Sequence, residues 1–182
     1  VLVINQNGVI FGAGSQINVG SLMATSLDIG SRETSVSANT TIAQRNEMFL
    51  QYGVLGYADS LATNIAVNLT PAAFSALTGT TGHGDVVVEQ GASISTVGSN
   101  GLIMLMAPHV INAGHLSAPS GQVILAAAAQ ELKLGRTTGA ADSADPNMRG
   151  LVVFAQGASN TYVWNQAAGL IEANRGNISL IA

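Results

Sequence analysis

The chain has 182 residues, of which 47% are hydrophobic and 9% are charged, and its formal net charge is -4. These values predict one domain with a substantial core, and they argue against intrinsic disorder and against a basic nucleic-acid-binding surface. The sequence has no cysteine, which excludes disulfides and thiolate metal sites.

The first 29 residues contain four short apolar runs that predict β-strands. The runs are VLVI, VIF, QINV and LMATSLDI, and they are separated by NQNG, GAGS and GS. Glycine, asparagine and serine favour turns, so each separator predicts a change of chain direction. The segment NQNG is therefore interpreted either as a hairpin turn or as a corner between strands of different sheets.

Residues 30–84 interrupt this pattern and predict a partly helical insertion. The stretch TIAQRNEMFLQYG begins with a capping box formed by Thr41 and Gln44. The stretch LTPAAFSALTG, residues 69–79, has Thr70 in the position of a helix N-cap. We expect the insertion to dock on one flank of the β structure.

Three later segments share the template G-x-[VI]-x-L-x-A and begin at Gly101, Gly121 and Gly176. Alternate residues of a strand face opposite sides, so the apolar template positions all point the same way. These positions are Ile103, Leu105, Val123, Leu125, Ile178 and Leu180. Short strands that recur after about 20 residues, with no helix between them, predict coils of a parallel β-solenoid. A β-sandwich is the structural alternative.

The predicted fold class is therefore all-β, with one solenoid domain over the whole chain. We assign coils to residues 1–29, 85–134 and 150–182, the insertion to residues 30–84, and a polar loop to residues 135–149. Because the chain starts in an apparent strand and ends on the apolar run ISLIA, we expect it to be a piece of a longer polypeptide. In a coil arrangement NQNG is a corner, since parallel coils need no hairpin.

Three asparagines each follow a β-branched or aromatic residue, namely Asn18, Asn112 and Asn165. Asparagine side chains can bond to backbone groups that a turn leaves free. We therefore predict that these three residues lie at corners and stack in ladders between coils.

The polar residues do not predict a catalytic site, a metal site or a cofactor. No two of the ten acidic residues recur at solenoid spacing with an arginine partner, as the paired carboxylates of a glycosidase on this fold would require. His83 and Asp85 are expected to cap a coil, and His109 and His115 to be polar corner residues. The longest apolar runs are shorter than the ~18–20 residues of a spanning helix, so no transmembrane segment is predicted.

Two aromatic residues near the C-terminus, Tyr162 and Trp164, have the chemistry of a sugar-stacking platform. Burial of these rings between coils is the favoured interpretation, and a carbohydrate platform is the alternative.

The opening run VLVINQNGVIFGAGSQINVGSLMATSLDIG resembles the N-terminal haemagglutination-activity, or two-partner secretion, domain of filamentous-haemagglutinin-like exoproteins. The matching residues are Asn5, Asn7, Gly8, Val9, Ile17, Asn18 and residues 24–29. The stretches GLIMLMAPHVINAGHLSAPSGQVILAAA and NQAAGLIEANRGNISLIA are similar to later coils of that family. Gln6 stands where the family usually has proline.

This resemblance implies a right-handed, pectin-lyase-like parallel β-helix that a Gram-negative bacterium exports through the periplasm to its surface or medium. An outer-membrane barrel transporter would recognise the domain through its periplasmic domains, at Asn5, Gln6, Asn7, Gly8 and Val9. The domain would then nucleate folding of a larger, non-catalytic adhesin that engages a host receptor or an extracellular polysaccharide. The alternative function is a polysaccharide-active or carbohydrate-binding β-helix protein.

Overall fold

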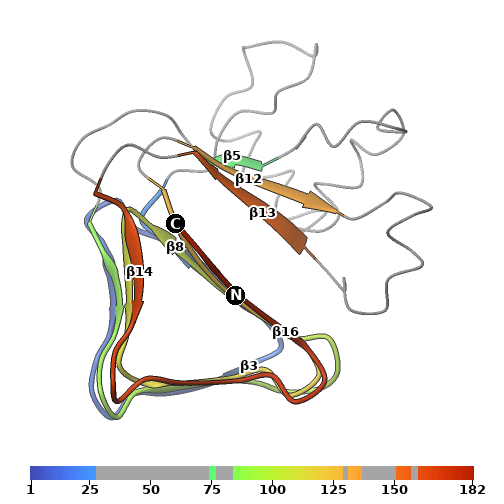
Figure 1. Cartoon of the computed structure of the whole chain (residues 1–182). Helices are drawn as coiled ribbons and strands as arrows, with labels where there is room; N and C mark the ends of the chain where they lie inside the picture. The colour runs from blue at the N-terminus through green and yellow to red at the C-terminus, as the bar shows by residue number, and fades with distance from the viewer. Residues whose placement is uncertain (28–73, 77–83, 129–130, 137–150, 157–159) are drawn as a thin grey trace.

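The computed structural model describes residues 1–27, 74–76, 84–128, 131–136, 151–156 and 160–182. These residues form strands and turns and contain no helix. Three parallel sheets of five, four and four strands surround a triangular interior, and a three-stranded antiparallel sheet lies beside them (Figure 1). This all-strand arrangement is compatible with a parallel β-helix.

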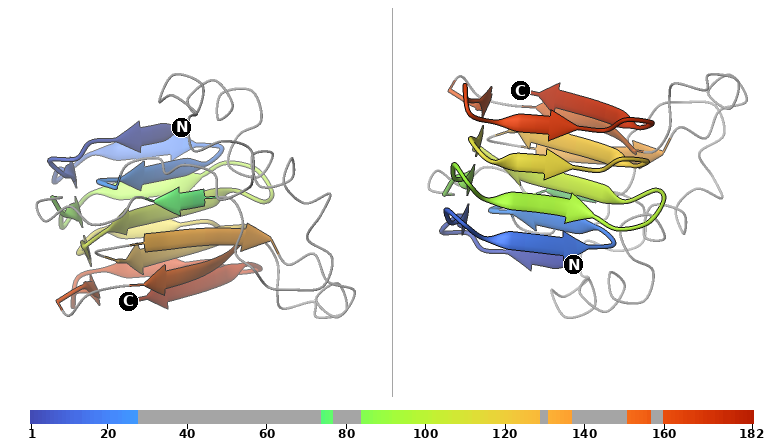
Figure 2. Two further views of the ribbon diagram at one scale, coloured as in Figure 1. Left: turned by 90° about the horizontal axis from the view of Figure 1, so that it is seen from above. Right: turned by 90° about the horizontal axis from the view of Figure 1, so that it is seen from below.

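The three parallel sheets are named A, B and C. Sheet A contains β1 (Leu2–Ile4), β4 (Leu22–Thr25), β8 (Leu102–Ala107), β11 (Gln122–Ala127) and β16 (Asn177–Ile181). Sheet B contains β2 (Val9–Phe11), β6 (Val86–Val88), β9 (His109–Asn112) and β14 (Tyr162–Asn165). Sheet C contains β3 (Gln16–Val19), β7 (Ser93–Thr96), β10 (His115–Ser117) and β15 (Leu170–Glu172). The chain visits A, B and C in turn, so each coil stacks on the one before it (Figure 2).

The register of sheet A follows the sequence template. Ile103 is opposite Val123, which is opposite Ile178, and the template leucines are aligned in the same way. Ile103 and Val123 are completely buried, whereas Ile178 and Leu180 are 47% and 52% exposed. The difference arises because β16 is the outermost strand of the sheet and has a neighbour on one side only.

The core lies inside the triangle and is built from one row of side chains per sheet. Leu105 and Leu125 enter it from sheet A, Val88 and Val110 from sheet B, and Ile94 from sheet C, all without solvent exposure. Burying such a side chain contributes roughly 1.5–3 kcal/mol. Because neighbouring coils supply the burial, a single coil cannot bury its own apolar residues.

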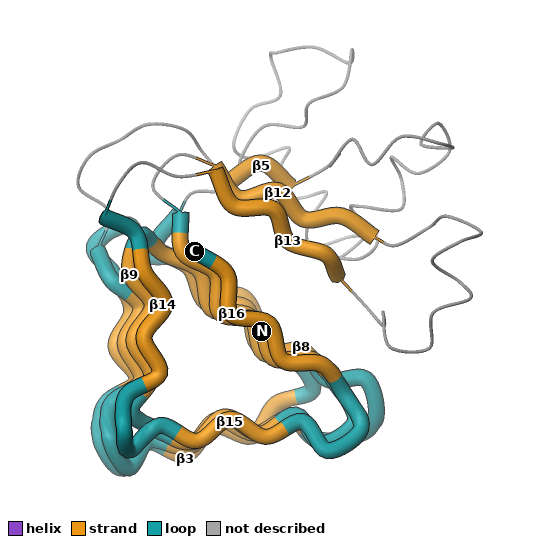
Figure 3. The backbone as a smooth tube through the Cα atoms, viewed as in Figure 1, coloured by secondary structure: helices purple, strands orange, loops and turns teal. Residues whose placement is uncertain are grey.

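Each template begins with glycine just after the corner between sheets C and A (Figure 3). At Gly121 and Gly176 the backbone of the preceding coil comes close, whereas a Cβ at Gly101 would collide with the Thr96 side chain of its own coil. A Cβ added to Gly121 would collide with the carbonyl oxygen of Gly101, and one added to Gly176 would collide with that of Gly121. The same two oxygens accept the backbone N–H groups of Gln122 at 2.8 Å and of Asn177 at 3.1 Å. Glycine at this position therefore permits the backbone bonds that join successive coils.

Sheet A is buried on its outer face as well. The outward-facing residues Met23, Met104, Met106 and Ile124 are at most 3% exposed. Strand β13 (Leu151–Gln156) contacts both β11 and β16, and Figure 1 shows the antiparallel sheet alongside sheet A. This second sheet therefore contributes to the cover over the outer face.

The antiparallel sheet corrects part of the predicted insertion. Its third strand, β5 (Phe74–Ala76), pairs with β12 (Glu131–Arg136), so the helix predicted over residues 69–79 is wrong at this strand. Pairing with a distant segment overrides the local capping signals here. The helix predicted from Thr41 onwards lies outside the described residues.

The predicted coils, which end at residue 134 and resume at residue 150, include part of β12 and all of β13. These two strands pair with each other in antiparallel orientation, with Glu131 opposite Gln156 and Arg136 opposite Leu151. Both strands therefore belong to the antiparallel sheet and stand outside the stacked coils.

The substitution Gly121→Ala tests the close approach between coils. We expect it to lower the free energy of unfolding by about 1–3 kcal/mol, because the added methyl group displaces the backbone of the neighbouring coil. The matched control is Gly20→Ala, since a Cβ at Gly20 meets no atom within 4 Å and changes stability by about 0.5 kcal/mol or less. Urea unfolding measures both variants, and equal losses would contradict the role assigned to Gly121.

Candidate functional site

Residues Asn5 to Gly8 form an exposed corner between β1 and β2. The Asn5 side-chain oxygen accepts the Asn7 backbone N–H at 3.1 Å, and the Asn5 carbonyl oxygen accepts that of Gly8 at 2.9 Å. Gly8 has a φ of 104°, a conformation that residues with a side chain rarely adopt. Because β1 and β2 belong to different sheets, the segment is a corner and not a hairpin turn.

The backbone of this corner is joined to the second coil. The Gly84 N–H donates to the carbonyl oxygen of Gln6 at 2.8 Å, and the Val9 N–H donates to that of Asp85 at 3.0 Å. A Cβ at Gly84 would collide with the carbonyl oxygen of Asn7. The side chains of the corner stay exposed while its backbone is fixed.

A two-member asparagine ladder connects the corners that follow sheet B. The Asn112 side-chain N–H donates to the side-chain oxygen of Asn165 at 2.7 Å. The oxygen of Asn112 accepts the Gly114 N–H at 3.2 Å, and the amide of Asn165 donates to the Gly169 carbonyl oxygen at 3.0 Å. Asn112 is completely buried, so its two contacts satisfy a side chain that water does not reach, whereas Asn165 is exposed.

Asn18 does not belong to this ladder, contrary to the sequence interpretation. It lies within β3, is exposed, and has Ser95 as its register partner. Asn18 therefore lies on the outer face of sheet C, within a strand and not at a corner.

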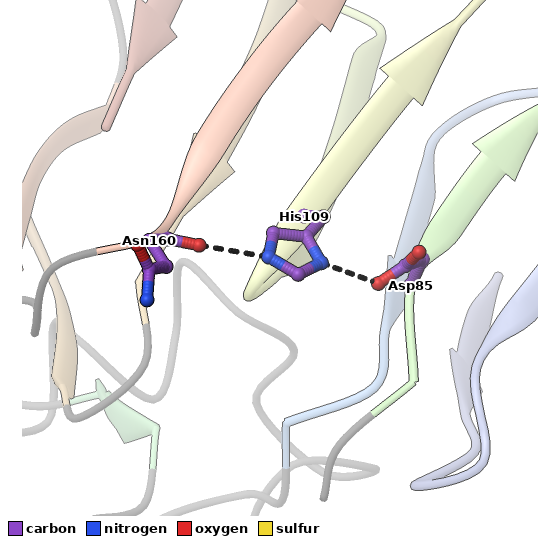
Figure 4. Close-up of polar contacts among 3 residues, drawn as sticks. All are labelled: Asp85, His109 and Asn160. Atoms are coloured by element: carbon purple, nitrogen blue, oxygen red, sulfur yellow. Dashed lines mark hydrogen bonds and ion pairs between the residues drawn. The ribbon is translucent and has the colours of Figure 1, made fainter. Parts of the chain in front are cut away.

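His109 connects two other coils at the corner between sheets A and B. Its Nδ1 lies 2.8 Å from a carboxylate oxygen of Asp85, and its Nε2 lies 2.8 Å from the carbonyl oxygen of Asn160 (Figure 4). The ring also stacks on Tyr162, with 4.4 Å between the centroids and 20° between the planes. A corner position is predicted for His109 from the sequence, but these partners are not, although the 24-residue spacing from Asp85 is close to one coil. His83 lies outside the described residues.

A second histidine pair lies on the outer face of sheet C. Nε2 of His115 is 2.7 Å from a carboxylate oxygen of Glu172 in the next coil. Within the ranges that the structure describes, no three histidine, aspartate or glutamate residues are grouped so as to hold a metal ion. The same ranges contain no helix with the length and apolar character needed to cross a membrane.

The aromatic residues Tyr162 and Trp164 are not buried between coils, which corrects the favoured sequence interpretation. They are 40% and 56% exposed and lie on the outer face of sheet B, because Val163 between them takes the inward position. Trp164 is opposite Ile111, which continues an outer row that ends at Ile10, 68% exposed. Sheet B therefore presents an apolar outer surface with two aromatic rings at one end.

Comparisons of this chain with protein-family models, with curated protein sequences and with solved structures gave no match.

Proposed function

We propose that the chain is a non-catalytic secretion and folding-nucleation segment of a larger secreted or surface adhesin. We also propose that its coils form a right-handed parallel β-helix. The observation that carries the proposal is the Asn5–Gly8 corner, whose backbone is fixed and whose first three side chains are exposed. A fixed, exposed segment offers a partner a surface that needs little ordering on binding.

The proposed partner is an outer-membrane barrel transporter with periplasmic recognition domains. Asn5, Gln6 and Asn7 offer amide donors and acceptors at the first corner of the stack, where the bonds to Gly84 and Asp85 in the next coil use backbone atoms only. Recognition through these amides would leave the pairing between coils undisturbed. A low content of charged residues also suits passage of the unfolded chain through a narrow barrel.

Folding nucleation follows from the way in which the coils bury one another. Each coil supplies a row of apolar side chains and an edge of unpaired backbone groups, onto which the next coil can add in register. At the last described coil, Ile178 and Leu180 are about half exposed on such an edge. This end of the stack suits the addition of further coils.

The double substitution Asn5→Ala and Asn7→Ala tests recognition by the transporter. We expect the secreted amount of the full-length protein to fall roughly tenfold in cells that carry the partner transporter, which corresponds to about 1.4 kcal/mol of lost recognition. Immunoblotting of the medium measures secretion, and circular dichroism of the purified variant checks that the fold is kept.

Asn18→Ala is the matched control for that experiment. It removes an exposed amide from the same coil but from sheet C, away from the corner, and is expected to leave secretion unchanged. Normal export of the double variant, or equal loss with Asn18→Ala, would contradict the proposed role of the corner.

A second candidate function, carbohydrate binding, is favoured by the exposure of Tyr162 and Trp164 on one face of β14. Residues two positions apart on a strand lie roughly 6.6 Å apart on the same face, so a sugar chain could contact both rings. The apolar faces of sugar rings stack on such surfaces, and Trp and Tyr supply large contact areas at low entropic cost.

Trp164→Ala tests this candidate on a glycan array probed with the purified protein. We expect a glycan that binds the unaltered chain to lose at least about fivefold in affinity, because one stacking contact is worth about 1 kcal/mol. Leu170→Ala is the control, since this residue is also about half exposed but belongs to sheet C. Absence of binding by the unaltered chain, or an equal effect of both substitutions, would rule the candidate out.

A further inference from the structure

Two long segments of the chain leave the stack at the same corner, between sheets A and B. One separates β4 from β6, and the other separates β11 from β14. The chain is again part of the stack at Gly84 in the first case and at Asn160 in the second. In the coil between them, only Pro108 separates β8 from β9. His109 therefore lies between the two points at which the chain returns.

The ring of His109 contacts both return points at once. Nδ1 is 2.8 Å from the carboxylate of Asp85, which follows Gly84, and Nε2 is 2.8 Å from the backbone carbonyl oxygen of Asn160. The three residues come from three successive coils, and Figure 4 shows the imidazole between the other two groups. One side chain thus joins segments that are far apart in the sequence.

The two partners of His109 can only accept a hydrogen bond. An ionised carboxylate and a backbone carbonyl oxygen carry no proton to donate, and a neutral imidazole has one N–H and one acceptor nitrogen. A neutral ring can therefore satisfy one contact, whereas the doubly protonated ring satisfies both. Stacking on Tyr162 also favours a cationic ring, because the aromatic face attracts positive charge.

We propose that His109 is a proton-dependent clamp that fixes the second return point of the chain. Its doubly protonated ring holds Asp85 and Asn160 together, and loss of one proton releases the contact to Asn160. The contact to Asp85 persists because a bond to a charged acceptor is stronger than one to a neutral carbonyl. Both bonds are therefore present at lower pH. The bond to Asn160 is lost when a rise in pH removes one proton from the ring.

The surroundings of the ring are consistent with this order of release. The ring contacts two titratable side chains, the Asp85 carboxylate and the Tyr162 phenol ring. Asn160 has a φ of 91°, a conformation that asparagine adopts more readily than most residues other than glycine. The Tyr162 N–H, two residues after Asn160, donates to the Pro108 carbonyl oxygen at 3.3 Å. Its hydrogen exchange therefore reports whether the chain is held at the second return point.

Amide hydrogen exchange of the full chain, followed by NMR, tests the clamp at about pH 5 and about pH 8, which bracket the range in which imidazole side chains change charge. After correction for intrinsic exchange rates, we expect the Tyr162 amide to be roughly fivefold better protected at the lower pH, as one hydrogen bond predicts. The Gly84 amide, bonded to Gln6 at 2.8 Å, is the internal control and is expected to change little.

Two variants assign the effect to His109. His109→Gln is expected to abolish the pH dependence at Tyr162, because glutamine does not titrate. His115→Gln removes the other described histidine that pairs with a carboxylate, and is expected to leave the pH dependence intact. Persistence of the effect in His109→Gln, or equal changes at Gly84 and Tyr162, would overturn the proposal.

Nitrogen-15 spectra of the imidazole rings in the unaltered protein provide a test that needs no variant. We expect both nitrogens of His109 to carry protons while the contact to Asn160 is present, and Nδ1 alone once that contact is lost. A ring that is neutral at the lower pH, or that keeps its proton on Nε2 at the higher pH, would contradict the clamp.

Discussion

The structure depends on in-register pairing of backbone groups between successive coils. Each parallel ladder fixes which residue of one coil lies over which residue of the next, and the three sheets impose this constraint on three sides at once. A position that faces inward in one coil must then face inward in its neighbours. This constraint accounts for the rows of buried Ile, Leu and Val in sheet A. It also accounts for the glycines that precede β11 and β16.

The same constraint determines where polar groups lie. Because corners stack on corners, the Asn112 side-chain N–H meets the side-chain oxygen of Asn165 in the next coil. At the corner between sheets A and B, the ring of His109 lies between groups of the coils before and after it. At the Asn5–Gly8 corner the next coil binds backbone groups, and the side chains of Asn5, Gln6 and Asn7 are exposed. Both proposals therefore arise from the position of a residue within the stack.

Much of the parallel stack could be predicted from local sequence patterns. The four apolar runs at the N-terminus correspond to the first four strands, and the template that begins at Gly101, Gly121 and Gly176 matches the register of sheet A. These features could be predicted because alternation with period two and a glycine at a fixed offset are local signals. The predicted handedness and the link to a transporter remain proposals.

The remaining features depend on contacts between distant segments. Phe74–Ala76 carries the signals of a helix but pairs with β12, which lies more than fifty residues further along the chain. The exposure of Trp164 depends on which face of β14 is turned inward, and the partners of His109 depend on the length of each coil. A period of about 20 residues indicates that coils stack, but it does not give the register at a corner where an insertion changes that length.

Engineered disulfides measure the register most directly, because the chain has no cysteine of its own. Ser95 and Ser117 are register partners on the outer face of sheet C, about 4.8 Å apart across the ladder, within the range that a disulfide spans. We expect the pair Ser95→Cys and Ser117→Cys to form a disulfide under mild oxidation. The pair Ser93→Cys and Ser117→Cys is shifted by two residues, to roughly 8 Å, and is expected to remain reduced. Equal cross-linking of the two pairs, or preferential cross-linking of the shifted pair, would contradict the in-register stack.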